Sequence, residues 1–154
     1  MNLASTYDIV IVGAGPAGCN LARMIDTGRY RVLLLDASSM RQKVCAGLLS
    51  PDAQKLLNRY KIAPPPGVFV HPQLSSVRVI DLGYPHIRHY RRSYLNVDRS
   101  AFDAYLLGLV PADVTIAGAR CHSIERRSNE FSLQLHHADG HREAIFARYV
   151  VGAD

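Results

Sequence analysis

The sequence predicts an α/β fold in which a parallel sheet is joined to an antiparallel β-meander. Residues 7–36 read as strand, glycine-rich turn, helix and strand within the ~30 residues of one βαβ unit. The last third of the chain carries short strand patterns separated by turn residues. After them comes an apolar run, Tyr149–Val151, which can return the chain to the parallel sheet.

The βαβ unit is organised around one glycine motif. An apolar run, residues 9–12, precedes Gly13-Ala14-Gly15-Pro16-Ala17-Gly18, and a helical pattern that Gly28 closes follows. A second apolar run, residues 32–35, ends on Asp36. The helical pattern places Leu21, Met24 and Ile25 on one side of the helix.

Each residue type in this motif has a physical role in a dinucleotide site. Gly13 permits the tight turn out of the strand, where a side chain would clash. Gly15 lets the backbone approach a pyrophosphate, and Gly18 lets the helix pack close to the strand. The N–H groups at the start of the helix favour phosphate, and Asp36 can accept hydrogen bonds from a ribose diol but repels a 2′-phosphate. We therefore expect a dinucleotide site rather than a purely structural glycine turn.

Composition places the chain among globular proteins of one-domain length. It has 154 residues, 48% hydrophobic and 20% charged. No apolar run approaches the ~20 residues of a membrane span, and the first residues lack the pattern of a signal peptide. Three scattered cysteines, Cys19, Cys45 and Cys121, do not resemble a disulfide framework, so we expect a reducing, cytoplasmic location.

The formal net charge of +5 raises the question of nucleic acid binding. The densest basic segment is Arg88–Arg92, but no nucleic-acid motif accompanies it. A solvated face explains most of this charge, with attraction of a phosphate-bearing cofactor as a smaller contribution. We expect no nucleic acid partner and no integral membrane segment.

The remaining elements follow from caps, turns and periodicity. Ser50 and Asp98 are expected N-caps of two helices, one that ends before Pro64 and one that runs from Arg99 to about Val110. The first is amphipathic and should pack through Ala53, Leu56, Leu57 and Tyr60. The expected strands are residues 77–80, 87–90, 114–116, 121–126, 131–136 and 144–151.

The histidines do not form a metal-ligand pattern. His136 and His137 are adjacent on an expected strand, so their side chains point to opposite faces. No cysteine or carboxylate stands at ligand spacing from them, so we expect no metal site. A nucleophile elbow and a recognisable hydrolytic triad are also absent from the sequence.

Four segments in order resemble one group of flavoproteins. Residues 7–36 resemble the N-terminal FAD-binding segment of the para-hydroxybenzoate hydroxylase and geranylgeranyl reductase superfamily. Lys43–Leu49 is similar to the loop beside the flavin, and Tyr94–Asp103 to the segment that enters the next helix. Arg148–Asp154 is similar to the strand that leads into the superfamily's Asp-Gly motif. The resemblance thus covers nearly the whole chain and implies FAD rather than NAD.

The resemblance also implies roles for individual residues. The glycine motif would hold the pyrophosphate, Asp36 the adenosine ribose, and Arg99 would lie on the pyrophosphate side. The backbone of Cys121 would pair with adenine, and Asp154 would reach toward the ribityl and phosphate end. The loop from Cys45 to Gly47 would border the isoalloxazine. The implied cofactor-binding residues are Gly13, Ala14, Gly15, Pro16, Ala17, Gly18, Asp36, Ala37, Ser38, Lys43, Cys45, Ala46, Gly47, Arg99, Cys121 and Asp154.

Cys45 separates the two branches of this superfamily. The hydroxylases tend to carry arginine in this loop and the reductases Cys-Gly-Gly, whereas this chain has Cys45-Ala46-Gly47. The loop therefore favours the reductase branch. Cys45 is the only candidate catalytic residue, as a proton donor or an electronic perturbant of the flavin. The favoured role for Cys45 is nevertheless that of a small packing residue, which is also the expected role of Cys19.

The expected function is the FAD-binding portion of a flavin-dependent oxidoreductase, with a geranylgeranyl-reductase-like reductase favoured. A monooxygenase or hydroxylase is the alternative, and a non-catalytic dinucleotide-binding module is the alternative of another class. NAD(P)H is the candidate electron donor, and the substrate would be a small or lipid-like molecule. We expect residues 1–154 to form a truncated Rossmann-like FAD-binding domain that lacks the substrate domain and has no turnover alone.

Overall fold

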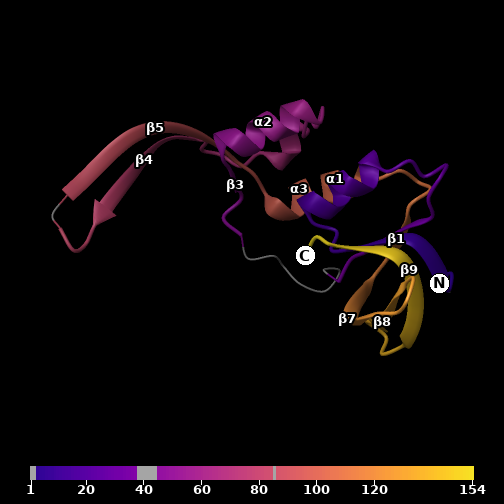
Figure 1. The fold of residues 1–154 in the computed structure, drawn as a ribbon. Helices are drawn as coiled ribbons and strands as arrows, with labels where there is room; N and C mark the ends of the chain where they lie inside the picture. The colour runs from indigo at the N-terminus through magenta and orange to yellow at the C-terminus, as the bar shows by residue number, and fades with distance from the viewer. Residues whose placement is uncertain (1–2, 38–44, 85) are drawn as a thin grey trace. The chain divides into compact units, whose positions relative to one another are not determined.

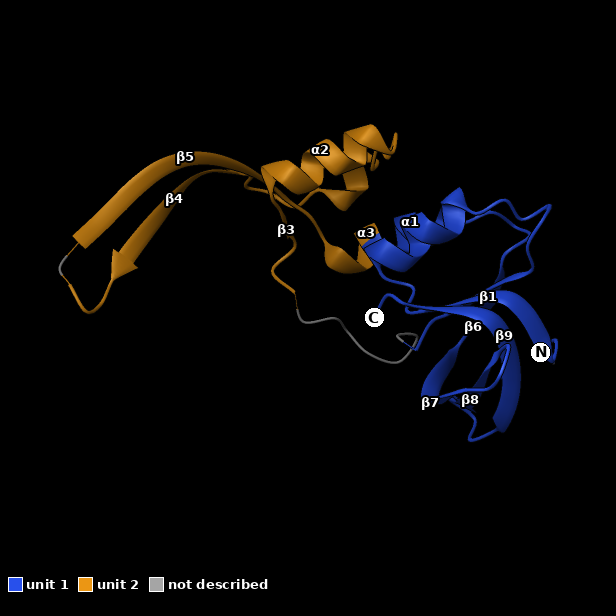
Figure 2. Cartoon of the chain, viewed as in Figure 1, with its two compact units in different colours: residues 1–42, 103–154 blue, residues 43–102 orange. Residues whose placement is uncertain are grey.

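The computed structural model describes residues 3–37, 45–84 and 86–154. The chain divides into two compact units, shown in Figure 2. Unit 1 comprises residues 1–42 and 103–154, and unit 2 comprises residues 43–102.

Unit 1 is built on a six-stranded mixed sheet with the strand order β6-β2-β1-β9-β8-β7. The strands β6, β2, β1 and β9 pair in parallel, whereas β9, β8 and β7 pair antiparallel as a meander. This arrangement confirms the predicted α/β fold with its parallel sheet and β-meander (Figure 1). The bounds are β1 Thr6–Val12, β2 Val32–Leu35, β6 Thr115–Ala117, β7 Ala119–Arg126, β8 Phe131–His137 and β9 Arg142–Gly152.

The sheet of unit 1 curls back on itself. The strands β6 and β7 stand at opposite ends of the strand order, yet only Gly118 separates them in the chain. The two ends of the sheet must therefore meet near this residue. The space enclosed by the curl is filled by one apolar core, made of Tyr7, Val10, Leu33, Leu35, Ala117, Ala119, Leu133, Leu135, Ile145 and Ala147.

The helix α1 (Pro16–Met24) lies close to β1 because Gly18 has no side chain. A Cβ atom at Gly18 would stand 1.9 Å from the Gly13 carbonyl oxygen and 3.3 Å from Ile11 Cγ2. This close approach buries the small residues Cys19 and Ala22. The packing role predicted for Gly18 and that predicted for Cys19 are thus confirmed.

The predicted end of this helix was wrong. The helix ends at Met24, not near Gly28. Met24 is 62% exposed. Leu21 and Ile25 are half-buried. The contact at Gly18 turns the face with the smallest side chains toward the strand, so the side with the larger apolar residues is less buried.

Unit 2 contains a three-stranded antiparallel sheet with the order β3-β5-β4. The strands β4 and β5 form a long hairpin, which extends the strands predicted at residues 77–80 and 87–90 (Figure 1). The two-residue strand β3 was not predicted, because Leu48 and Leu49 are recognisable as a strand only through their pairing with Asn96 and Leu95. The bounds are β3 Leu48–Leu49, α2 Pro51–Arg59, η2 Pro66–Val68, β4 Leu74–Asp81, β5 His86–Asn96 and α3 Arg99–Gly108, and α3 continues into unit 1.

Both predicted N-caps are present. Ser50 Oγ accepts a hydrogen bond from the Ala53 N–H at 3.2 Å, at the start of α2. Asp98 Oδ1 accepts one from the Ala101 N–H at 2.9 Å, at the start of α3. These side chains satisfy N–H groups that have no partner within the helix, which explains why the helices begin there.

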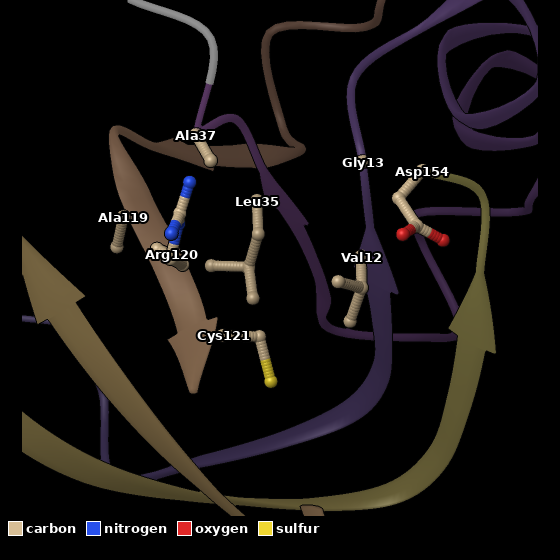
Figure 3. A pocket seen from close by; sticks show the side chains of 8 residues that line it. All are labelled: Val12, Gly13, Leu35, Ala37, Ala119, Arg120, Cys121 and Asp154. Carbon is tan, nitrogen blue, oxygen red and sulfur yellow. The ribbon is translucent and has the colours of Figure 1, made fainter. Parts of the chain in front are cut away.

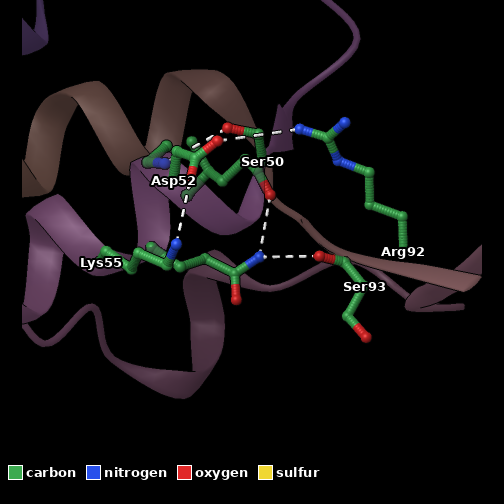
Figure 4. A network of polar contacts seen from close by, with 8 residues as sticks. Ser50, Asp52, Lys55, Arg92 and Ser93 are labelled. Carbon is green, nitrogen blue, oxygen red and sulfur yellow. Dashed lines mark hydrogen bonds and ion pairs between the residues drawn. The ribbon is translucent and has the colours of Figure 1, made fainter.

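Polar contacts connect α2 to its neighbouring strands, as Figure 4 shows. Gln54 Nε2 donates to the carbonyl oxygens of Leu49 and Ser93, both at 3.0 Å. Asp52 lies 3.1 Å from Lys55 Nζ and 3.9 Å from Arg92 Nη2. The expected apolar packing of this helix is weaker than predicted, since no residue of α2 is fully buried and Leu56 is 51% exposed.

Among the residues that the structure describes, no helix is both long enough and apolar enough to span a bilayer.

Candidate nucleotide-binding site

A pocket of about 410 Å³ opens in unit 1 where the carboxyl ends of β1 and β2 meet the start of β7 and the end of β9 (Figure 3). Its volume falls within the ~300–1,000 Å³ of ligand pockets. In α/β sheets, ligands bind at the carboxyl ends of the parallel strands. The lining residues are Val12, Gly13, Leu35, Ala37, Ala119, Arg120, Cys121 and Asp154.

Backbone hydrogen bonds fix the positions of the strand ends that form this pocket. The Gly13 N–H donates to the Leu35 carbonyl oxygen at 3.0 Å, and the Ala153 N–H donates to the Val12 carbonyl oxygen at 2.8 Å. The Asp36 N–H donates to the Ala117 carbonyl oxygen at 2.9 Å. Main-chain pairing therefore fixes the pocket rim independently of the side chains that line it.

Gly13 is required at this rim for two reasons. Its φ of 113° lies in the region that favours glycine. A Cβ atom there would also stand 2.6 Å from the backbone of Ala153 and Asp154. The role predicted for Gly13, a tight turn in which a side chain would clash, is confirmed.

The next residues of the motif form an uncapped helix start. Gly15 is the N-cap of α1, with no side-chain cap hydrogen bond, and Pro16 follows it in the first turn. Pro16 and Ala17 are exposed. A helix start without a side-chain cap leaves N–H groups and the positive end of the helix dipole available to an anion.

Four of the predicted cofactor residues come together in the pocket. They are Gly13, Ala37, Cys121 and Asp154, from four separate places in the sequence. Asp36 stands between the lining residues Leu35 and Ala37 and is half-buried.

A second pocket of about 340 Å³ shares Val12, Cys121 and Asp154 with the first. It extends past the start of β7 toward the end of β9, and Gly152 belongs to its wall. The two pockets thus adjoin along one strip of unit 1. The complete lining of the second is Val12, Cys121, His122, Ser123, Ile124, Gly152 and Asp154.

Cys121 stands where the two pockets meet, and its side chain is half-buried. Burial raises the pKa of the Cys121 thiol above its ordinary value. The thiol is therefore neutral near pH 7, which suits a wall residue better than a nucleophile.

Sequence reasoning missed four of the lining residues. Val12, Leu35 and Ala119 are apolar strand residues with no chemical signature, and the curl of the sheet brings them together. Arg120 had a signal that was available, since it directly precedes Cys121 in the chain. Its charge was instead included in the general basic balance.

The other predicted residues that the structure describes lie in unit 2. Arg99 Nη1 donates a hydrogen bond to Cys45 Sγ at 3.0 Å, and Cys45 and Ala46 are exposed. Gly47 has a φ of 70°, and a Cβ atom there would stand 2.0 Å from the Val97 carbonyl oxygen, so local packing already requires glycine. The predicted residues Ser38 and Lys43 lie outside the described residues.

A histidine pair lies on the meander beside the second pocket. The rings of His122 and His136 are stacked, with centroids 4.5 Å apart and an interplanar angle of 11°. Desolvation, followed by the charges of Arg142 and His122, lowers the pKa of His136. Within residues 3–37, 45–84 and 86–154, no three or more histidine, cysteine or acidic side chains form a metal-binding group.

No protein-family profile matches the sequence. Among curated proteins, Protein CbrA of Escherichia coli strain K12 and that of Shigella sonnei are each 38% identical over 154 residues. The match covers 96% of this chain and 43% of each relative. The chain therefore spans less than half the length of the curated relatives that it matches.

Solved structures match the chain over nearly its whole length. A geranylgeranyl bacteriochlorophyll reductase-like protein of Thermoplasma acidophilum superposes with a TM-score of 0.70 at 20% identity, covering 97% of this chain and 39% of that one. The p-nitrophenol 4-monooxygenase PnpA of Pseudomonas putida gives 0.74 at 16% identity, with 98% and 42% covered. The myxobacterial FAD-dependent halogenase CndH gives 0.73 at 18% identity, with 98% and 38% covered.

The chain has their fold. The resemblance stated from the four sequence segments is thus confirmed at the level of the fold, which is the Rossmann-like α/β fold of these three structures. These neighbours include a reductase-like protein, a monooxygenase and a halogenase, so the fold does not identify one reaction.

Proposed function

We propose that this chain binds FAD as the cofactor-binding portion of a flavin-dependent oxidoreductase. One observation carries the proposal: the glycine motif at the uncapped start of α1 stands beside a pocket that gathers Gly13, Ala37, Cys121 and Asp154. A phosphate-bearing ligand has N–H donors at the helix start, and a mostly apolar pocket adjoins them.

The residues of unit 1 fit the ADP half of this cofactor. The first turn of α1 would hold the pyrophosphate, because its N–H groups lack a side-chain cap. Asp36 would accept hydrogen bonds from the adenosine ribose, and the backbone of Cys121 would contact adenine. Asp154 would reach toward the ribityl chain, and the bound flavin would supply the electron-transfer chemistry.

The reductase branch is the favoured reaction class. The loop Cys45-Ala46-Gly47 supports it, as does the structural likeness to the geranylgeranyl bacteriochlorophyll reductase-like protein. Hydroxylation is the alternative, supported by the structural likeness to the p-nitrophenol 4-monooxygenase PnpA. We propose NAD(P)H as electron donor and a small or lipid-like molecule as substrate.

Turnover is proposed for a protein of the relatives' length rather than for residues 1–154 alone. The chain spans 43% of its curated relatives and 39% of the reductase-like structure. Residues 1–154 would then supply the FAD-binding domain, and the substrate domain would lie outside them.

Ligand titration of the purified chain tests the proposal. Flavin fluorescence would follow FAD and FMN, and calorimetry would follow ADP and NAD. We expect FAD to bind and ADP to compete with it, because both carry the adenosine and pyrophosphate groups. FMN lacks the ADP half and should bind much more weakly. Binding of FMN as tight as that of FAD, or no binding of FAD and ADP, would overturn the assignment.

A further inference from the structure

Arg120 supplies the positive charge of the first pocket and has no role in the site described so far. Among the eight lining residues that the structure describes, Arg120 is the cation and Asp154 the anion. Figure 3 shows the Arg120 side chain extending toward Ala37, on the side of the pocket formed by the end of β2.

The backbone around Arg120 is fixed although its side chain is exposed. Ala119 before it is 2% exposed and belongs to the core, and Cys121 after it is half-buried. In the sheet, Arg120 is paired with His136 of β8. The start of the Arg120 side chain is therefore held at the pocket rim, while the guanidinium extends into solvent-accessible space.

The charges around Arg120 leave it available for a ligand. Within the described part of the chain, no carboxylate forms an ion pair with it. Its neighbour on β8 is His136, which is itself paired with Arg142 of β9, and His122 stands two residues along β7. The neighbours of Arg120 along β7, β8 and β9 are thus histidines and an arginine, and neither Asp154 nor Asp36 forms a salt bridge with it. A guanidinium without a paired carboxylate can interact with an electron-rich or anionic ligand.

The order of groups along the rim indicates which part of a dinucleotide Arg120 meets. In the proposed function, the helix start at Gly15 would hold the pyrophosphate and Asp36 at the end of β2 would hold the ribose. Ala37 follows Asp36 and shares the pocket with Arg120. The group beyond the ribose is the base, so the planar guanidinium is placed beside the adenine ring rather than the pyrophosphate. Arginine stacks on flat aromatic systems through its planar, weakly hydrated cation.

We infer that Arg120 stacks on the adenine of the bound dinucleotide and so increases affinity for the adenosine half of the cofactor. This inference rests on the proposed function. It adds a residue outside the glycine motif that selects adenosine-containing ligands such as FAD and ADP over FMN.

Binding measurements on Arg120 variants test the inference. R120Q removes the positive charge, and R120K keeps the charge but replaces the planar guanidinium with an ammonium group. We expect both variants to bind FAD and ADP about 2- to 30-fold more weakly than the unmodified chain, the range of a cation–π contact. Pyrophosphate affinity should not change. R126Q removes the same charge from the far end of β7 and is the matched control, with affinities expected to equal those of the unmodified chain.

The outcomes separate the inference from the proposed function. If the unmodified chain binds FAD, and R120Q binds ADP with the same affinity as the unmodified chain, the stacking role is overturned. The proposal that the chain binds FAD then stands. Full affinity in R120K would show that the planar group is not needed, which overturns stacking. An equal loss of pyrophosphate affinity would assign Arg120 to phosphate and would also overturn stacking. If the unmodified chain binds neither FAD nor ADP, both proposals fail. Circular dichroism of each variant establishes that the fold is retained.

Discussion

The guanidinium of Arg99 donates a hydrogen bond to the thiol sulfur of Cys45, with 3.0 Å between Nη1 and Sγ. The two residues are 54 positions apart, and both were predicted from the sequence to contact the cofactor. Cys45 is exposed, which is not what a small packing residue would show. An exposed thiol that accepts a hydrogen bond from a cation is accessible to a ligand, and we predict that Cys45 contacts one.

The first prediction is that Cys45 changes the flavin electronically. Cys45→Ser retains an acceptor for Arg99, and Cys45→Ala removes it. Both should shift the absorbance or the reduction potential of bound flavin, with the larger shift in the alanine variant. Cys121→Ser, at the proposed adenine end, is the control and should leave the spectrum unchanged. Identical spectra and potentials in all the proteins would exclude an electronic effect of Cys45 on the flavin.

The extent to which the site could be predicted depended on how local each signal was. The N-caps Ser50 and Asp98 could be predicted, because each depends on residues within one helical turn. The βαβ unit could be predicted because its motif lies within one continuous stretch of ~30 residues. Strand β3 could not, since two residues become a strand only through a partner almost 50 positions away.

The pocket itself shows the same limit. Gly13, Ala37, Cys121 and Asp154 were named from motifs, but nothing in those motifs says that they share one pocket. Their meeting in one pocket depends on the curl of the sheet, which brings the edge strands β6 and β7 together at Gly118. Pairing between distant strands sets this curl, and a single sequence does not state strand pairing.

The second prediction contrasts two glycines of the motif. Gly15 has φ −75° and ψ −174°, extended backbone that any residue adopts, so Gly15→Val should keep the fold. Its side chain would block the close approach of phosphate, so flavin retention should be lost. Gly18→Ala would place a Cβ atom 1.9 Å from the Gly13 carbonyl oxygen, which should cost about 1–3 kcal/mol in the free energy of unfolding.

Thermal unfolding and flavin occupancy of the two variants distinguish these effects. Full flavin occupancy in Gly15→Val would contradict the phosphate role of that residue. A Gly18→Ala variant as stable as the unmodified chain would mean that α1 can move away from β1 at no cost.

The third prediction concerns Asp36 at the end of β2. Asp36→Ala should weaken FAD binding by about 1–3 kcal/mol, the range for a hydrogen bond to a charged group. Binding of FMN should not change, because FMN has no adenosine ribose. Isothermal titration with both flavins measures the difference. An unchanged FAD affinity would mean that the ribose is held by another residue.

The fourth prediction is a pH dependence at His136. Desolvation, Arg142 and His122 lower its pKa in the folded chain, whereas the unfolded chain titrates near ~6.5. The unfolded state therefore binds the proton more readily, so the stability that neutral His136 contributes is complete above that pH and is lost as the pH falls. The free energy of unfolding should accordingly decrease on acidification, and less so in His136→Asn.

Proton NMR titration of the histidine rings measures this directly. Arg142→Gln should raise the pKa of His136 toward its ordinary value, because it removes one of the charges that lower it. Arg148→Gln, on the same strand, is the control. A His136 pKa that is the same in the Arg142 variant and the unmodified chain would exclude this electrostatic cause.

The last prediction uses the three thiols to locate the two halves of the cofactor. Cys19 is fully buried, Cys121 lines both pockets of unit 1, and Cys45 is exposed in unit 2. Without ligand, alkylation should be fastest at Cys45 and slowest at Cys19. Because burial raises the pKa of Cys121, its thiolate fraction at a given pH is smaller than that of an ordinary thiol, so its reaction should accelerate only at higher pH.

Ligands should change this order in two different ways. ADP carries only the half of the cofactor proposed for the first pocket, so it should protect Cys121 and leave Cys45 reactive. FAD also carries the isoalloxazine and should protect both thiols. Mass spectrometry of the alkylated peptides measures each site separately, with Cys19 as an internal control. If Cys121 is alkylated equally fast with and without ADP, adenine does not bind in this pocket. Equal protection of Cys45 by ADP and FAD would mean that the thiol senses the nucleotide half, and Cys45 would then no longer be a candidate for contact with the flavin.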